Sequence, residues 1–121
     1  MIVAGFGARA GAGMDSLRAA FDLASRDASA VTALAGLRAK ASPLMALAES
    51  LALPLHLFDP PELTAMPTLT RSQASLDAHG TGSVAEASAL AAAGPDARLL
   101  APRHVSPDGM ATCAIAQGSA L

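Results

Sequence analysis

The N-terminal segment combines a short apolar run, a glycine-rich stretch and a helical pattern. Residues 2–4 are Ile, Val and Ala, and residues 5–13 contain four glycines. An apolar run that leads through a glycine turn into a helix is typical of an α/β unit, in which backbone N–H groups gather beside a helix N-terminus. We therefore predict an anion-facing loop that includes Gly5 and Gly7, with Arg9 as its only full charge.

Two other interpretations of the glycine stretch stay open. A glycine turn can serve only to bring a strand and a helix close together, without any ligand. The order Gly5-x-Gly7-x-x-Ala10 also matches a loosened dinucleotide-binding fingerprint, which requires an acidic residue about twenty positions later. Asp27, the nearest acid, lies in a polar connection ahead of the next predicted strand, so nucleotide binding is disfavoured.

The composition limits the number of domains and the classes of partner. With 121 residues, of which 52% are hydrophobic, the chain is expected to form a single domain over residues 1–121. Only 2% of the residues are aromatic, and the net charge is −2. Nucleic-acid binders use stacking platforms and basic stripes, so we expect no nucleic-acid partner. Cys113 is the only cysteine, which excludes an intrachain disulfide and a cysteine metal cluster.

Signals for a membrane, a metal or a cofactor are absent from the sequence. No stretch reaches the roughly eighteen apolar residues of a membrane span, and no basic leader precedes the first apolar run. His56 stands alone, without a second histidine at metal-ligand spacing. We expect a cytoplasmic protein with no membrane contact, no metal and no cofactor.

An amphipathic helix is expected after the glycine stretch. Asp15 or Ser16 can cap this helix, and the polar residues 25–29 end it. Its apolar positions recur at helical spacing and are Leu17, Ala20, Phe21 and Ala24.

The strands are less regular in sequence than the helices. Residues 31–37 fit a strand or a helix, and we take them as a strand because Ser42-Pro43 can then open the next helix as N-cap and first residue. The other predicted strands are apolar runs bounded by turn residues and cover 54–58, 98–101 and 110–116. The turn sequence Ser106-Pro107-Asp108-Gly109 predicts that the last two strands, 98–101 and 110–116, form an antiparallel hairpin at the C-terminus. Cys113 is expected to be buried there, and Arg103 and His104 to be solvated.

Lys40, the only lysine, lies between the second strand and the second helix. If the strands are parallel, their carboxyl ends share one edge of the sheet, so Lys40 and the glycine stretch would lie at the same edge. A solvated surface charge is the alternative interpretation of Lys40.

Residues 64–82 form a connection that is long and irregular for so small a domain. After this connection, Ser83 and Glu86 have the spacing of a capping box at the start of an alanine-rich helix that ends near Gly94-Pro95. A general acid or base at Glu86 is the alternative.

With these elements placed, the chain resembles the CobE/CbiG C-terminal domain family of cobalamin biosynthesis, and the resemblance covers essentially its whole length. The matching signatures occur in family order and are Gly5-Phe6-Gly7-Ala8-Arg9, Lys40, Thr70-x-Ser72, Gly82-Ser83-Val84-Ala85-Glu86-Ala87-x-Ala89-Leu90, Ala93-Gly94 and Thr112-Cys113-Ala114-Ile115-Ala116. The resemblance implies a single three-layer α/β/α domain whose sheet is mostly parallel with a C-terminal antiparallel hairpin. Longer relatives tend to carry an acid shortly after the lysine, whereas Ala41, Ser42 and Pro43 follow Lys40.

The resemblance also implies a ligand, a corrin precursor ringed by acetate and propionate carboxylates. A binder of such a macrocycle needs cations, backbone N–H donors and hydroxyls around an apolar floor. The candidate ligand-binding residues supply these groups and are Gly5, Gly7, Arg9, Lys40, Thr70, Arg71, Ser72 and Ser83. We expect Arg9, Lys40 and residues 70–86 to surround one cleft at the carboxyl edge of the sheet.

The expected function is that of a carrier or accessory factor that binds a polycarboxylate tetrapyrrole or precorrin intermediate. A hydrolase or isomerase acting on such an intermediate, with Glu86 as general base, is the first alternative. A structural partner of other enzymes of the cobalamin pathway is the second.

Overall fold

A six-stranded sheet organises the fold. The computed structural model describes residues 1–26 and 30–118. Asp27, considered above as the acid of a dinucleotide-binding fingerprint, lies outside the described residues. The strands run in the order β3-β2-β1-β6-β4, and β5 also pairs with β6. β1, β2 and β3 are parallel, whereas β6 is antiparallel to β1, β4 and β5. The strands are β1 (Ile2–Ala8), β2 (Ala33–Leu37), β3 (Leu55–Phe58), β4 (Arg98–Leu99), β5 (His104–Val105) and β6 (Ala111–Gln117).

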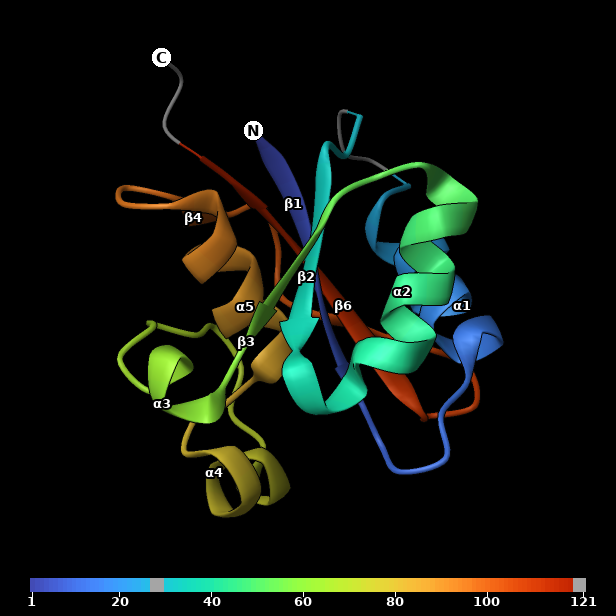
Figure 1. The fold of residues 1–121 in the computed structure, drawn as a ribbon. Helices are drawn as coiled ribbons and strands as arrows, with labels where there is room; N and C mark the ends of the chain where they lie inside the picture. The colour runs from blue at the N-terminus through green and yellow to red at the C-terminus, as the bar shows by residue number, and fades with distance from the viewer. Residues whose placement is uncertain (27–29, 119–121) are drawn as a thin grey trace.

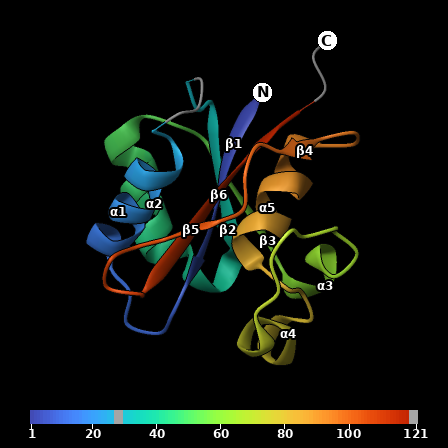
Figure 2. The same ribbon diagram turned by 180° about the vertical axis from the view of Figure 1, so that it is seen from behind.

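Helices cover both faces of this sheet, as Figures 1 and 2 show. One face carries α1 and α2, and the opposite face carries α5, with α3 and α4 on the same side. The three-layer α/β/α arrangement is therefore confirmed. The helices are α1 (Met14–Ala24), α2 (Ala41–Leu51), α3 (Pro60–Leu63), α4 (Gln73–His79) and α5 (Val84–Ala93), and a 3-10 turn (Arg38–Lys40) precedes α2.

The prediction that Gly5 and Gly7 lie in a loop is wrong, because β1 continues to Ala8. The strand pairs with β6 from Ile2, opposite Gln117, to Ala8, opposite Ala111. These backbone hydrogen bonds outweigh the weak strand preference of glycine. The connection between β1 and α1 is confined to residues 9–13.

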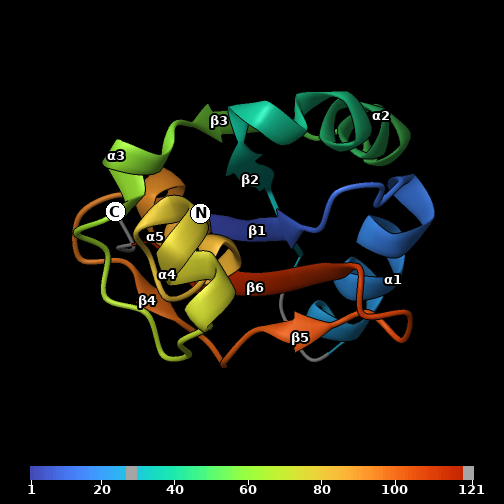
Figure 3. The same cartoon turned by 90° about the horizontal axis from the view of Figure 1, so that it is seen from below.

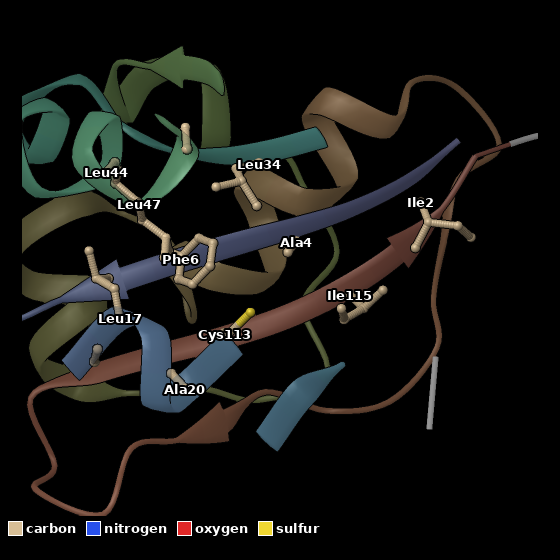
Figure 4. Close-up of a cluster of buried hydrophobic side chains, with 12 residues drawn as sticks. Ile2, Ala4, Phe6, Leu17, Ala20, Leu34, Leu44, Leu47, Cys113 and Ile115 are labelled. Carbon is tan, nitrogen blue, oxygen red and sulfur yellow. The ribbon is translucent and has the colours of Figure 1, made fainter. Parts of the chain in front are cut away.

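The hydrophobic core lies between the sheet and the α1–α2 layer (Figure 4). It uses one side of β1, in keeping with the two-residue period of a strand. Its buried members include Ile2, Ala4, Phe6, Leu17, Ala20, Leu34, Leu44, Leu47, Cys113 and Ile115. The expected apolar face of α1 and the burial of Cys113 are confirmed, and burial raises the pKa of the Cys113 thiol.

Small residues let α5 pack closely on the other face of the sheet. At Gly5, an added Cβ would overlap the carbonyl oxygen of Ala85 and lie 2.5 Å from the amide nitrogen of Ala89. Every residue from Val84 to Leu90 is buried. The glycine in β1 thus fixes the distance between the sheet and α5.

Two predicted helix caps are wrong. Gly13 precedes α1, which leaves Asp15 and Ser16 inside its first turn. Lys40 precedes α2, so Ser42 is not the N-cap, because the 3-10 turn brings the chain into the helix earlier. The strand interpretation of 31–37 is confirmed, with β2 beginning at Ala33.

The predicted C-terminal antiparallel hairpin is present around residues 106–109. Its strands are β5 and β6, with His104 opposite Cys113. The segment 98–101 was predicted as the first strand of this hairpin, which is wrong: it contributes β4, which pairs with the other end of β6, and β5 takes its place beside the turn. No helix among the described residues is long and apolar enough to cross a membrane.

Candidate functional site

An open cleft of about 550 Å³ lies at the carboxyl edge of the parallel strands. Figure 3 views the molecule from this side, where α4 and the β1–α1 connection lie. The cleft is lined by the ends of β1 and β2, by α4, by the first residue of α5, and by the β5–β6 hairpin. Residues distant in sequence therefore meet in one concave surface, the usual place for a ligand in an open α/β sheet.

Three cationic residues line the cleft. Arg9 follows β1, Lys40 follows β2 and Arg103 precedes β5, and no Asp or Glu is among the lining residues. The ion pairs within residues 1–26 and 30–118 are Arg18–Asp22 and Arg38–Asp59, so none of the three cations is paired with a carboxylate there. A cleft of this charge in a chain of net charge −2 favours an anionic ligand.

Apolar side chains and hydroxyls make up the rest of the cleft wall. Val105, which is exposed, and Met110, which is half-buried, supply apolar surface to the cleft, whereas Phe6, Leu37 and Val84 line it with side chains that are almost fully buried. Ser75 also lines the cleft, and its Oγ is buried without a hydrogen-bond partner in the described part of the chain. Its backbone N–H donates to Ser72 Oγ at 3.3 Å, which fixes the start of α4. The cleft lining thus combines apolar side chains with cations and hydroxyls.

Four of the eight predicted ligand-binding residues line the cleft: Gly7, Arg9, Lys40 and Ser72. The other four predicted residues are not among its lining residues and are Gly5, Thr70, Arg71 and Ser83. Ligand binding by the four that line the cleft stays a prediction.

Gly5 and Ser83, two of the four residues outside the lining, hold α5 in place. Gly5 lies under α5, and Ser83 Oγ accepts a hydrogen bond from the Glu86 amide at 3.2 Å. Arg71 is exposed. The Thr70 amide donates to Glu86 Oε1.

The predicted capping box at α5 is only half formed. Ser83 caps the helix, but the Glu86 carboxylate accepts hydrogen bonds from three other amides. Leu69 and Thr70 each donate to Oε1 at 2.8 Å, and Arg103 donates to Oε2 at 2.9 Å. Glu86 is 0% exposed and is not among the residues that line the cleft. This placement favours a role in holding loops together.

Sequence reasoning missed α4 and Arg103. The helix begins after Ser72, which caps it, and ends at Gly80, whose φ is 72°. This Ser-to-Gly spacing within residues 64–82 is the local signal that could have identified α4. Arg103, expected to be solvated, lies half-buried at the cleft. Its placement depends on the pairing of β5 with β6. The turn at residues 106–109 predicts a hairpin, but the strand predicted before the turn covers 98–101, which leaves Arg103 in a connection.

A metal site is not apparent in the described residues, where no group of three His, Cys, Asp or Glu side chains could hold an ion.

Comparison with known proteins links this fold to one family. A family model described as cobalamin synthesis G C-terminus matches residues 2–116. The solved structure of CobE, a protein from the cobalamin (vitamin B12) biosynthetic pathway, is 31% identical with a TM-score of 0.86, and the match covers 96% of this chain and 89% of CobE. Cobalamin biosynthesis protein chiG from Agrobacterium tumefaciens str. C58 is 45% identical with a TM-score of 0.75, over 99% of this chain and 100% of that one.

A more distant structure shares the fold alone. The cobalamin biosynthesis protein G homolog from Sulfolobus solfataricus is 18% identical with a TM-score of 0.73. The match covers 98% of this chain but 37% of that protein. Among curated proteins, the sequence has no significant match.

Proposed function

Because the chain belongs to the family of cobalamin synthesis G C-terminal domains, we propose that it binds a polycarboxylate tetrapyrrole intermediate of corrin-ring synthesis. The binding site in this proposal is the cleft at the carboxyl edge of the sheet.

One observation carries the proposal: Arg9, Lys40 and Arg103 line the cleft together, and no carboxylate lines it with them. A precorrin carries acetate and propionate groups around its ring, so several cations can each meet a different carboxylate. Hydrogen bonds to charged groups contribute about 1.5 to 3 kcal/mol each, which makes such contacts the main source of affinity and orientation.

The apolar wall of the cleft supports the same ligand class. Val105 and Met110 offer apolar surface to the hydrocarbon face of a macrocycle, while Gly7 presents backbone without a side chain. Binding sites for small molecules commonly combine such surface with a few polar groups that fix orientation.

Binding without chemistry is favoured over the hydrolase or isomerase alternative. A general base must lie within hydrogen-bond reach of the reacting proton. Glu86, the candidate base, is not among the lining residues and already accepts three backbone hydrogen bonds. The described lining residues include no Asp, Glu or His. We therefore propose a carrier or accessory role, in which the chain exchanges its ligand with enzymes of the same pathway.

Two corrins of similar size but different charge test the proposal. Cobyrinic acid carries free carboxylates, whereas in cobinamide the corresponding groups are amides. The visible absorbance of the corrin reports binding, which is useful because the chain contains no Trp or Tyr. We expect cobyrinic acid to bind at least about ten-fold more tightly, as one lost charge contact would give.

The mass and the visible spectrum of the corrin, measured after incubation and release from the protein, separate the two functions. An unchanged mass and spectrum support a carrier. For this corrin or a precorrin, a changed mass would support a hydrolase, and a changed spectrum at unchanged mass would support an isomerase. Equal affinity for both corrins, or no binding of either, would contradict the proposal.

A further inference from the structure

Glu86 is the only charged residue among the buried residues of the described chain. Burying a carboxylate is costly unless hydrogen bonds replace its contacts with water. Such a residue at an inward position of a helix calls for an explanation, since an alanine would fit the pattern of α5.

The hydrogen bonds of Glu86 join two separate loops. Oε1 accepts from the amides of Leu69 and Thr70, which lie between α3 and α4, and Oε2 accepts from the amide of Arg103, just before β5. Both oxygens are used, and each donor is a backbone group. Removing the carboxylate would leave three amides without this acceptor, a change that costs more than the loss of an ordinary surface contact.

Close backbone packing reinforces the first of these loops. The Ser72 amide donates to the carbonyl oxygen of Gly82 at 2.8 Å. An added Cβ at Gly82 would lie 2.8 Å from the carbonyl oxygen of Thr70, so the segment 70–72 lies directly against the chain that leads into α5. This contact fixes the start of α4, which forms one wall of the cleft.

The second loop places a cation at the cleft. Arg103 is half-buried, lines the cleft and is not ion-paired with a described carboxylate. The amide of Arg103 donates a hydrogen bond to Glu86, and the next residue, His104, pairs with Cys113 in the sheet. The backbone of Arg103 is therefore held from both directions.

We propose that Glu86 is a positioning residue that ties the two loops together and holds Arg103 as the third anion-binding cation of the cleft. The inference rests on the proposed function for its ligand, a polycarboxylate corrin. It adds Arg103 to Arg9 and Lys40, and it gives Glu86 a role that involves no proton transfer.

A measurement without ligand tests whether the Glu86 carboxylate holds the two loops. In Glu86→Gln, one carboxylate oxygen becomes an NH2 group, which cannot accept from an amide. Amide hydrogen exchange should become faster at Leu69, Thr70 or Arg103, while the Leu34 amide, bonded to Pro54 in the sheet, stays protected. Glu62→Gln is the matched control, because Glu62 also accepts from a backbone amide, that of Asp59, but is not a lining residue of the cleft. Unchanged exchange at all three amides would overturn the inference.

A binding cycle with cobyrinic acid tests the effect on Arg103. Arg103→Ala should raise the Kd about ten-fold, and Arg98→Ala, a control at an exposed arginine that is not a lining residue, should not. Glu86→Gln should raise the Kd several-fold. In the double variant with Arg103→Ala, Glu86→Gln should raise the Kd little beyond the value of Arg103→Ala alone. In the double variant with Lys40→Ala, the two fold-increases in Kd should multiply.

The pattern of coupling distinguishes positioning from a general loosening of the fold. Two results would overturn the inference: Glu86→Gln could couple equally to Arg103→Ala and Lys40→Ala, or it could bind with wild-type affinity. The proposed function would still stand in either case if the wild-type chain binds cobyrinic acid and Lys40→Ala weakens that binding. A wild-type chain that does not bind cobyrinic acid would overturn both. If Glu86→Gln does not fold, variants of Arg103 test the inference. Arg103→Ala should bind cobyrinic acid more weakly than the wild type, and Arg103→Lys should recover part of the affinity. Unchanged binding in Arg103→Ala would overturn the inference.

Discussion

Asp108 links the turn between β5 and β6 to α1. Its Oδ2 accepts a hydrogen bond from Ser16 Oγ, and its Oδ1 accepts from Ser106 Oγ, both at 2.5 Å. The hydroxyl of Ser106, followed by that of Ser16 and the amide of Met110, lowers the pKa of Asp108 from 3.8 to about 2. Ser16, predicted as a possible helix cap, thus makes a hydrogen bond that joins α1 to the turn between β5 and β6.

This pKa predicts how stability depends on pH. The folded-state value lies below the unfolded one, so ionised Asp108 stabilises the fold above about pH 4, and this contribution is lost as the pH falls towards 2. Asp108→Asn should lower the urea midpoint at neutral pH and have progressively less effect over that acidic range. Far-UV circular dichroism measures both midpoints. A difference between wild type and variant that is the same at neutral pH and near pH 2 would contradict the assignment.

At the scale of elements, the two glycines of β1 should respond differently to an added methyl group. Gly5→Ala places a Cβ against the backbone of α5 at Ala85 and Ala89, which cannot move without shifting the helix. Gly7→Ala meets the end of the Thr112 side chain at 2.7 Å, and that side chain can rotate. We expect Gly5→Ala to lower the free energy of unfolding by about 3 kcal/mol or more and Gly7→Ala to change it by about 1 kcal/mol or less.

Urea unfolding followed by far-UV circular dichroism measures both variants, and each serves as the control for the other. Equal losses of stability would mean that α5 does not depend on close approach at Gly5.

Local sequence was sufficient to predict some helices and strands, but not others. The stripe from Leu17 to Ala24 identified α1 because a helical face repeats within a few residues. The length of β1 was missed because its glycines are weak strand formers, and only the pairing with β6 and the contact with α5 explain them. Glu86 has the local spacing of a capping box, but its carboxylate bonds to loops 16 and 17 residues away in sequence.

At the scale of the whole molecule, the parallel-strand rule accounts for what could be predicted of the cleft. Arg9 and Lys40 follow two adjacent parallel strands, so the order of strands and loops along the chain is enough to predict that both lie at one edge of the sheet. Arg103 follows β4, which is antiparallel to β6, and no comparable rule applies to its loop. The third cation could therefore be found only from the assembled sheet.

The last prediction concerns the charge of the assembled cleft. Arg9→Ala and Lys40→Ala should each raise the Kd for cobyrinic acid about ten-fold, because each removes a charged contact to a carboxylate. Both residues lie outside the hydrophobic core, so the free energy of unfolding should change by about 0.5 kcal/mol or less. Wild-type affinity should also fall as salt is raised, since exposed charges are screened, and the slope should be smaller in each variant. Salt-independent binding that is unaltered in both variants would place the ligand elsewhere on the molecule.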